Sequence, residues 1–366
     1  MAVKVGIPKE TFAGEKRVSV IPSDVQRLVK AGLDVLAEAG AGSEAGYFDY
    51  AEKGAKIAES REDIFKSSDI ILQIHGRQES AKPGQILIGL FDPLNEAEPL
   101  KKVASTGATV FALELLPRIS RAQSMDVLSS MATISGYKAV LLAAYYLPKM
   151  FPMMMTAAGT LMPAKVFIIG AGVAGLQAIA TARKLGAVVS AYDVRPAVKE
   201  QIESLGAKFI ALPLETGAAE EKGGYAKELG GEFYKKQREL MLKIVSGSDC
   251  VITTALIPGK KSPVLVTADM VKKMAKGSVI VDLAASQGGN CELTKADEIV
   301  NAGGITILGP TNLPSEVACH ASQMYSKNIT SFLLNMIKNG AVNISMEDEI
   351  VSKTLVAKDG KTWNLS

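Results

Sequence analysis

Residues 117–131, with the sequence PRISRAQSMDVLSSM, gather many hydrogen-bonding side chains between two apolar stretches of the chain. An arginine can hold a phosphate, and a glutamine amide can both donate and accept a hydrogen bond. Gln123, Asp126 and Ser129 are spaced by three residues, so they share a face if a helix begins early in this segment. Alternatively, Arg118 and Asp126 pair with each other and cap the helix. The residue types make this segment a candidate ligand-binding site.

A glycine-rich loop follows in KVFIIGAGVAG, where Gly170-x-Gly172-x-x-Gly175 comes directly after an apolar run and directly before a helical pattern. Gly170 allows a tight turn, Gly172 lets the backbone approach a pyrophosphate, and Gly175 lets the helix pack on the strand. The helix N-terminus then presents its partial positive charge to the phosphates. The spacing and its context predict a dinucleotide-binding turn.

Asp193 ends the next apolar run, VVSAYD, eighteen residues after the last glycine of the loop. An acid at this place can accept hydrogen bonds from both ribose hydroxyls and would repel a 2′-phosphate. Arg195, two residues further on, softens that exclusion, but the acid at the strand end should dominate. We therefore expect NAD rather than NADP. Residues 253–260, 281–290 and 309–315 follow later strands, where each is either part of the same crevice or a plain turn.

Acid–base chemistry has few candidates, because the chain contains two histidines. We expect His75, which follows a strand, and His320, near a helix start, to be structural. A dehydrogenase acting on an alcohol or amine needs a general acid or base. Hydride exchange between two nicotinamides needs instead ring alignment and polar groups that hold the carboxamide and ribose, and the residue 117–131 segment offers such groups. The three cysteines, Cys250, Cys291 and Cys319, are widely spaced, so neither a disulfide framework nor a metal site is expected.

The elements that must position these residues alternate between strand-like and helical patterns in both halves of the chain, which predicts an α/β protein with two doubly wound parallel sheets. We expect residues 1–126, completed by about 320–366, to form the first domain and 127–319 the second. Ser23 or Asp24 should cap an early helix that Gly32 ends. Long helices are expected over 125–146 and 322–340. A C-terminal hairpin is expected around Asp359 and Gly360.

Two segments break this rhythm. The apolar region 139–165 is interrupted by prolines, and its uninterrupted part, 150–164, is too short for a membrane helix. We therefore expect two buried segments joined by a proline turn and no membrane span. Residues 215–241 are glycine-rich and charged, and they form either a surface loop without a role or a lid over a ligand. The 366 residues are 48% apolar, 22% charged and carry a net charge of +3, a globular composition without the clustered basic face of a nucleic-acid binder.

Taken together, the residues resemble the alanine dehydrogenase and proton-translocating transhydrogenase N-terminal superfamily over nearly the whole chain. VGIPKET…GEKRVSVIP is similar to its N-terminal signature, and VFIIGAGVAGLQAIATARKLGAVVSAYDVRP to its nucleotide signature. Alanine dehydrogenases carry a substrate lysine, a catalytic histidine and an aspartate at positions that match Gln73, Phe91 and Ser286 here, although Arg17 is kept. PRISRAQSMDVLSS instead resembles the NAD-site loop of the transhydrogenase branch, and GGYAKELG its mobile loop.

The resemblance implies two Rossmann-like domains with a cleft between them, NAD(H) as cofactor, no metal and a homodimer. It also implies an NADP(H)-binding partner domain and a membrane-spanning partner subunit, which place this chain in the cytoplasm on the inner face of the membrane. Hydride would pass between NADH here and NADP on the partner, coupled to proton translocation. Arg118, Gln123 and Asp126 would form the reacting face. The implied cofactor contacts are Arg118, Ile119, Ser120, Gln123, Ser124, Met125, Asp126, Ser129, Gly170, Gly172, Val173, Gly175, Asp193, Val194, Arg195, Gly224, Tyr225, Ala255 and Leu256.

Two alternatives remain open. One is a stand-alone amino-acid dehydrogenase such as alanine dehydrogenase, which the residues at Gln73, Phe91 and Ser286 disfavour. The other is a nucleotide-sensing module that binds NADH without transferring hydride.

Overall fold

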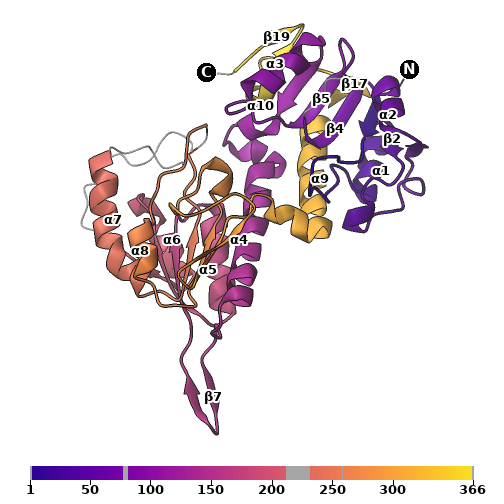
Figure 1. The fold of residues 1–366 in the computed structure, drawn as a ribbon. Coiled ribbons are helices and arrows are strands. Elements are labelled where there is room, and N and C mark those ends of the chain that lie inside the picture. The colour runs from indigo at the N-terminus through magenta and orange to yellow at the C-terminus, as the bar shows by residue number, and fades with distance from the viewer. Residues whose placement is uncertain (1, 77–80, 212–230, 258, 365–366) are drawn as a thin grey trace. The chain divides into compact units, whose positions relative to one another are not determined.

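The computed structural model describes residues 2–76, 81–211, 231–257 and 259–364, with the side chain of Tyr234 left aside (Figure 1). The chain divides into two compact units. Unit 1 consists of Met1–Met131 with Pro314–Ser366, and unit 2 of Ala132–Leu313. The domain limits expected from the sequence stay a prediction, because compactness alone does not show which segments fold independently.

Unit 1 contains an eight-stranded sheet in the order β19-β18-β6-β5-β4-β1-β2-β3, in which the six strands from β6 to β3 are parallel. These six strands are β1 (Lys4–Ile7), β2 (Asp34–Glu38), β3 (Lys56–Ala58), β4 (Ile70–His75), β5 (Ile86–Leu90) and β6 (Thr109–Ala112). The C-terminal strands β18 (Leu355–Lys358) and β19 (Lys361–Thr362) extend the sheet antiparallel to β6 and to each other. Ile70, Ile71, Leu72 and Ile74 of β4 are all fully buried, as expected for a strand covered on both faces.

The helices of unit 1 are α1 (Pro22–Lys30), α2 (Arg61–Ser67), α3 (Ala97–Ser105), α9 (Ala318–Asn335) and α10 (Glu349–Thr354). Neither Ser23 nor Asp24 caps α1, so that expectation is wrong: its N-cap is Ile21, and no side chain caps it. Asp24 is buried instead, where it pairs with Arg27 and accepts a hydrogen bond from Ser326 of α9. Gly32, with a φ of +84°, follows the helix end as expected.

Unit 2 contains a seven-stranded sheet in the order β11-β10-β9-β12-β13-β15-β14. Its parallel strands are β9 (Lys165–Ile169), β10 (Val188–Tyr192), β11 (Lys208–Phe209), β12 (Cys250–Thr253), β13 (Val279–Asp282) and β15 (Ile305–Leu308). The edge strand β14 (Ile299–Ala302) runs antiparallel to β15, which sequence alternation alone did not predict. The helices are α4 (Val127–Tyr146, shared with unit 1), α5 (Val173–Lys184), α6 (Lys199–Ser204), α7 (Gly231–Ser246) and α8 (Ala268–Lys272).

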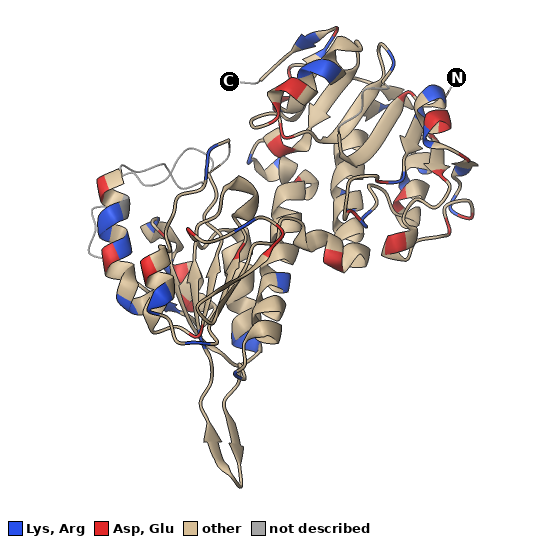
Figure 2. Cartoon of the chain, in the orientation of Figure 1, with Lys and Arg blue, Asp and Glu red and all other residues tan. Residues whose placement is uncertain are grey.

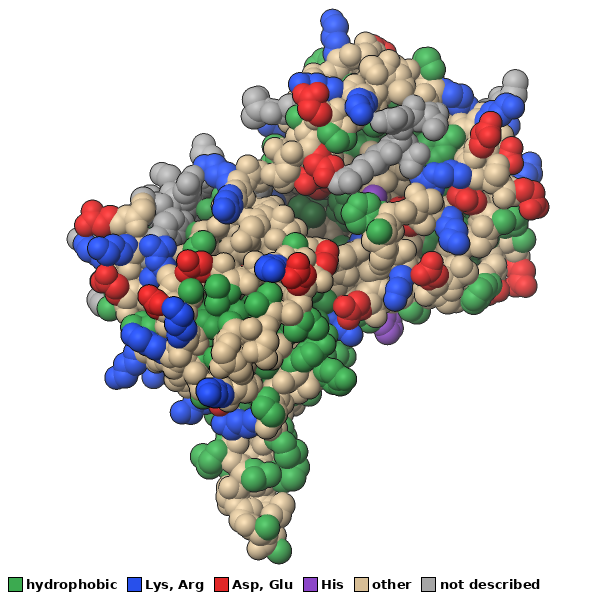
Figure 3. Space-filling view, in the orientation of Figure 1, with side chains coloured by type: hydrophobic (Ala, Val, Ile, Leu, Met, Phe, Trp, Pro, Cys, Tyr) green, Lys and Arg blue, Asp and Glu red, His purple; other side chains and the backbone are tan. Residues whose placement is uncertain are grey.

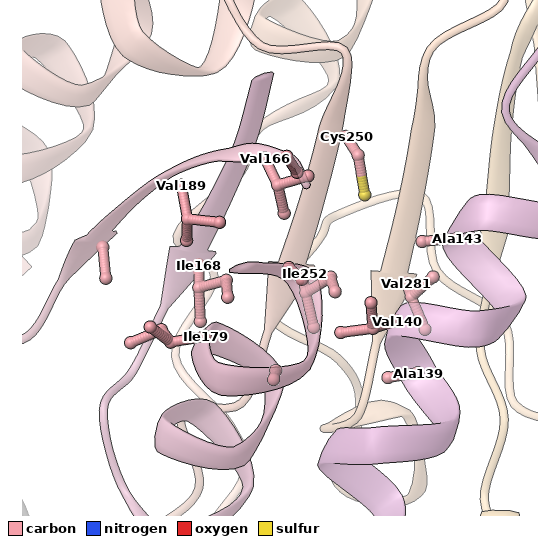
Figure 4. Close-up of a cluster of buried hydrophobic side chains, with 14 of the residues drawn as sticks. Ala139, Val140, Ala143, Val166, Ile168, Ile179, Val189, Cys250, Ile252 and Val281 are labelled. Atoms are coloured by element: carbon pink, nitrogen blue, oxygen red, sulfur yellow. The ribbon is translucent and has the colours of Figure 1, made fainter. Parts of the chain in front are cut away.

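The core of unit 2 shows why α4 is so apolar. Its small residues Ala139, Val140 and Ala143 are fully buried and pack toward side chains of β9, β12 and β13, including Ile252 and Val281 (Figure 4). Within the described ranges, α4 is the one helix long and apolar enough to cross a membrane by length and composition. Packing against the sheet accounts for the apolar residues Ala139, Val140 and Ala143 of this helix.

The expected α/β class with two Rossmann-like, doubly wound sheets is confirmed, but several element limits differ. The helix expected from residue 125 begins at Val127, after a 3-10 helix η3 (Ser120–Met125). The helix expected over 322–340 spans 318–335 and is followed by the small hairpin of β16 (Ile337–Lys338) and β17 (Ala341–Val342). The C-terminal hairpin at Asp359 and Gly360 is present, although 349–354 before it is helical. Residues 231–241, expected to lie in a loop insertion, belong to α7.

The remaining 3-10 helices are η1 (Ser43–Ala45), η2 (Leu113–Leu115), η4 (Pro196–Val198), η5 (Ala285–Gln287) and η6 (Leu313–Val317).

The first of the two expected buried segments lies in α4 and is partly buried, but the expectation for the second is wrong at residues 153–162. These residues form an exposed hairpin between the buried Phe151 and Ala164. Strands β7 (Met154–Thr156) and β8 (Gly159–Leu161) pair with each other and extend away from the body of unit 2 (Figure 1). The hairpin carries no charged residue (Figure 2), and its apolar side chains lie on the surface (Figure 3). Met155 is 76% exposed and Met162 66%. So much exposed methionine on a charge-free hairpin is typical of a protein contact surface.

Candidate functional site

The glycine loop of unit 2 lies between β9 and α5, as the sequence predicts. Gly170 has a φ of +97°, and a Cβ there would lie 2.6 Å from Oγ1 of Thr254. A Cβ on Gly175 would lie 1.9 Å from the carbonyl oxygen of Gly170, so helix and loop can touch only through glycine. Gly172 differs, because it is the N-cap of α5 with a φ of −73°, and a Cβ there would meet no atom within 4 Å. The chain therefore leaves open space at the helix N-terminus.

That open space fits the pyrophosphate of a dinucleotide. The first turn of the twelve-residue helix α5 has backbone N–H groups without intrahelical partners, and the helix dipole favours an anion there. Val173, the first helical residue, is 42% exposed.

Asp193 lies beside this loop and is held by its surroundings. Its Oδ2 accepts a hydrogen bond of 2.7 Å from the backbone N–H of Ala171 in the glycine loop. Arg195 donates to both carboxylate oxygens, from Nε to Oδ1 at 2.9 Å and from Nη2 to Oδ2 at 2.9 Å. The carboxylate is buried and its rotamer is fixed before any ligand is considered. Sequence reasoning placed Asp193 correctly at the end of β10, but it missed that Arg195 would be bound to it.

A second loop of unit 2 meets the glycine loop because β12 pairs with β9. Thr254 donates to the carbonyl of Gly170 at 3.0 Å. Asn290, fully buried, accepts from the N–H of Ala255 and donates to the carbonyl of Ala255, both at 2.9 Å. Asn290 therefore fixes the loop that carries Ala255 and Leu256, and Leu256 is left 38% exposed. The sequence indicated these segments but not the two side chains, Thr254 and Asn290, that join them.

The unit 2 candidates thus lie along one edge of the sheet, after β9, β10 and β12. These strands are parallel neighbours, so their carboxyl ends meet. The residue 309–315 segment contains Thr311, which bonds Asp297 at 2.9 Å, in keeping with the plain-turn alternative.

The polar segment of unit 1 has a different local structure from the one expected. Asp126 is extended, with φ −75° and ψ 92°, between η3 and α4. Its oxygens accept from the N–H of Ser129 at 2.9 Å and from the hydroxyl of Ser129 at 2.6 Å. Asp126 therefore caps α4. The shared helical face of Gln123, Asp126 and Ser129 is wrong, since η3 and α4 are separate helices.

Exposure divides the segment into two sides. Ala122 and Met125 are buried, so the side chain of Met125 is not available to a ligand and only its backbone is. The exposed positions are Arg118, Ser120, Arg121, Gln123 and Ser124, while Ile119 is intermediate. Gln123 is thus accessible from solvent, as a ligand contact requires.

The carboxyl edge of the unit 1 sheet holds a buried ionic cluster. Arg17 donates to Glu15 from Nε at 2.7 Å and from Nη2 at 2.6 Å, with both side chains nearly inaccessible. His75 Nε2 lies 2.9 Å from Oε2 of this carboxylate, the oxygen that Arg17 Nη2 also binds, and the His75 ring stacks on Phe12. Burial would raise the pKa of Glu15, but Arg17 and His75 outweigh burial and hold it well below its usual value. His75 is therefore engaged in structure, and His320 lies exposed in the first turn of α9.

Of the three positions that match alanine dehydrogenase, two are buried here and the third, Ser286, is exposed. Gln73 and Phe91 lie inside unit 1, and neither atom of the Gln73 amide has a hydrogen-bond partner. Gly224 and Tyr225 lie outside the described residues. Within the ranges that the structure describes, no group of His, Cys, Asp or Glu side chains could hold a metal ion.

Comparisons with known proteins agree over nearly the whole chain. Residues 6–135 match the family described as alanine dehydrogenase/PNT, N-terminal domain, and residues 139–364 match alanine dehydrogenase/PNT, C-terminal domain. The first part of the NAD(P) transhydrogenase alpha subunit of Rhodospirillum rubrum is 48% identical over 372 residues, covering 98% of this chain and 97% of that protein.

Two solved structures are similar as well. A transhydrogenase from Sinorhizobium meliloti has a TM-score of 0.89 at 44% identity, covering 98% of this chain and 100% of that one. An L-alanine dehydrogenase has a TM-score of 0.81 at 25% identity, covering 98% of this chain and 96% of that one.

Proposed function

This chain belongs to the alanine dehydrogenase/PNT family, with NAD(P) transhydrogenase alpha subunits among its relatives, and we propose that it is the NAD(H)-binding component of such an enzyme. In this proposal, hydride passes between NADH held by this chain and NADP on a partner domain. A membrane-spanning partner couples the transfer to proton translocation. The chain would then lie in the cytoplasm, attached to the membrane only through that partner.

The residues of unit 2 would hold the cofactor, and bound NAD(H) would supply the hydride. The N–H groups after Gly172 would bind the pyrophosphate, and Asp193 would accept from the adenosine ribose. The loop of Ala255 and Leu256 would border the same site. Among the described residues of unit 2, these are the groups whose geometry supports the proposal most directly.

The residues of unit 1 would act at the nicotinamide end. Gln123 would hold the carboxamide, since its exposed amide both donates and accepts, and Arg118 would balance phosphate charge. Asp126 and Ser129, which already bond each other, would contact the ribose through their remaining lone pairs. The observation that carries the proposal is the exposed amide of Gln123 on a helix whose inner face is buried.

Hydride exchange between two nicotinamides needs no protein acid, and the cluster of unit 1 suits that requirement. Glu15, Arg17 and His75 are bound to one another, so their charges are already compensated. A stand-alone amino-acid dehydrogenase would need a general acid or base that exchanges protons with its substrate.

We further propose a homodimer, which the exposed hairpin β7–β8 supports. Met155→Asp together with Met162→Asp would place charges on this apolar surface. We expect a monomer by analytical ultracentrifugation, with NADH binding retained. The control variant is Met346→Asp, at an exposed methionine of unit 1, which should remain dimeric.

The decisive experiment follows NADH oxidation at 340 nm with two sets of acceptors. Pyruvate with ammonium is added first, and then a purified NADP-loaded transhydrogenase partner domain with an oxidised nicotinamide analogue. Turnover only with the partner supports the proposal. Turnover with pyruvate and ammonium would make the chain an amino-acid dehydrogenase, and NADH binding without either reaction would make it a sensing module.

The role of Gln123 has its own test. Gln123→Asn shortens the side chain by one methylene and keeps the amide, so hydride transfer should fall while NADH still binds. Unchanged transfer would contradict the assigned role.

A further inference from the structure

Arg121 lies inside the candidate segment but binds the far end of the chain. Its guanidinium spans both oxygens of Asp348, 227 residues away, with Nη1 at 3.0 Å from Oδ2 and Nη2 on Oδ1. Two parallel N–H···O bonds fix direction as well as distance. This contact ties η3 to the turn that begins α10.

Asp348 is itself held in place. Its Oδ2 accepts from Nδ2 of Asn335, at the end of α9, at 2.9 Å. Its Oδ1 accepts from the N–H of Ile350 at 3.0 Å, which makes Asp348 the N-cap of α10. The hydrogen bonds from Arg121 and Asn335 lower the pKa of Asp348 to about 2, so the carboxylate stays charged at any physiological pH.

A second anchor reaches η3 from the middle of α9. Nδ2 of Asn328 donates to the carbonyl of Ser124 at 2.9 Å. Ala122 and Met125 are buried on the same side. The segment is thus fixed by the Arg121–Asp348 ion pair, which we call the clamp, and by the hydrogen bond to the Ser124 carbonyl. The buried side chains of Ala122 and Met125 hold it as well.

A 3-10 helix needs such anchors more than an α-helix does. Its hydrogen bonds have poorer geometry, and runs beyond three or four residues are uncommon. The six-residue η3 also lacks a side-chain cap at its N-cap residue, Ile119. Its conformation therefore depends on contacts made from outside the segment.

We propose that Arg121, Asp348, Asn335 and Asn328 are positioning residues that hold Gln123 at the angle needed for hydride transfer. The inference rests on the proposed function and assigns to the C-terminal segment a role in the reaction. None of the four touches the cofactor in this proposal. They act through the backbone of η3, which carries Gln123 between two anchored positions, Arg121 and Ser124.

The clamp should affect stability and reaction rate to different extents, which makes the proposal testable. Arg121 is 53% exposed in its side chain, and ion pairs between exposed side chains contribute little to stability. A shift of about 1 Å in a reacting group can slow a reaction by about 100-fold. Loss of the clamp should therefore slow hydride transfer far more than it lowers the melting temperature.

The experiment compares Arg121→Ala, Asp348→Asn and the double variant in the full chain, assayed with the NADP-loaded partner domain. Asn at position 348 keeps the helix cap while it removes the charge. We expect kcat to fall about tenfold in each single variant, with the KM for NADH changed by less than about threefold. The kcat of the double variant should fall no further, because both substitutions remove the same ion pair.

Glu98→Gln is the matched control, because it breaks an exposed ion pair with Lys101 elsewhere in unit 1. It should transfer hydride like the wild type, and all variants should melt within a few degrees of it. Wild-type kcat in the single variants would overturn the inference, as would multiplying effects in the double variant or a fall in melting temperature that matches the loss of rate. An inactive wild type that binds NADH would refute the proposed function instead.

Discussion

The carboxyl edges of the two sheets differ in whether side chains fill them. In unit 1, the loop after β1 places Glu10 on the end of β4, where it accepts from the N–H of Ile74 at 2.6 Å and of His75 at 3.4 Å. In unit 2, the loop after β9 is built of glycine and alanine, and the N-cap position of α5 has no neighbouring atom where a side chain would be. One edge is filled by the chain's own carboxylates, and the other is left open.

The difference shows that topology alone does not make a nucleotide site. Both sheets are doubly wound, and a crevice at the carboxyl ends of their strands is the expected ligand position in each. In unit 1, an internal carboxylate takes the N–H groups that an anion would need. In unit 2, the absence of side chains keeps such groups available. Each prediction below breaks or sharpens this contrast, from the largest expected effect to the smallest.

Gly175→Ala should have the largest effect, because its Cβ would lie 1.9 Å from the carbonyl oxygen of Gly170. Backbone at such a distance must move, and overpacking of this kind costs about 3 kcal/mol or more. We expect a lower midpoint of urea unfolding together with loss of NADH binding. A stable variant that binds NADH normally would contradict the close packing.

Arg17→Ala should destabilise the closed edge of unit 1. Removing one partner of a buried ion pair leaves an uncompensated charge and costs about 3–5 kcal/mol. Chemical unfolding measures the change. Arg27→Ala is the control, since Arg27 pairs with Asp24 at a side chain that is 41% exposed and should cost about 1 kcal/mol or less.

Gly172→Ala should separate binding from stability. A φ of −73° suits alanine, and the added methyl meets no atom of the protein, so the unfolding midpoint should not change. The methyl would occupy the space that a pyrophosphate needs. Loss of one hydrogen bond to a charged group, about 1.5–3 kcal/mol, raises the Kd for NADH at least about tenfold by titration calorimetry. Tight NADH binding by this variant would argue against a cofactor at the glycine loop.

Asp193→Asn should change cofactor preference. The neutral amide no longer repels a 2′-phosphate, and Arg195, now held less tightly, becomes able to bind it. We expect NADH to bind about tenfold more weakly and NADPH more strongly, as measured by cofactor fluorescence. Adding Arg195→Ala should remove the gain for NADPH, and if it does not, Arg195 has no such role.

The smallest expected effect is a change in stability with pH, caused by a carboxylate at the filled edge of unit 1. Burial raises the pKa of Glu114, after β6, from 4.5 to about 7. The folded protein therefore binds more protons than the unfolded one between these values. Its stability should fall as the pH rises from about 4.5 to about 7. Glu114→Gln should reduce this dependence of stability on pH, as measured by urea unfolding at several pH values. If the dependence is unchanged, another group causes it.

Some expectations from sequence held because their causes are local. Alternation of apolar runs with amphipathic ones depends on residues near each other, and it predicted the doubly wound α/β class of both sheets. The outcome at 150–164 shows the limit of that reasoning. Apolar residues alone do not say whether a segment is buried within its own chain or left exposed, and here it forms an exposed hairpin.

The predictions for the candidate site also include one that held and one that failed. The glycine spacing predicted the loop because Gly170 and Gly175 meet constraints within one turn of chain. The expected shared helical face failed because Asp126 breaks the helix and caps the next one, which depends on a competition between local conformations that spacing does not resolve.

By itself, the sequence determined the α/β class, the position of the glycine loop and the acid at the end of β10. These follow from the backbone freedom of glycine and from periodicity, which act over a few residues. Only the tertiary structure decided that Asn290 fixes the loop after β12 and that Arg121 meets Asp348. The reason is physical: a hydrogen bond needs donor and acceptor within about 3 Å, and for groups up to 227 residues apart only the completed fold brings them that close.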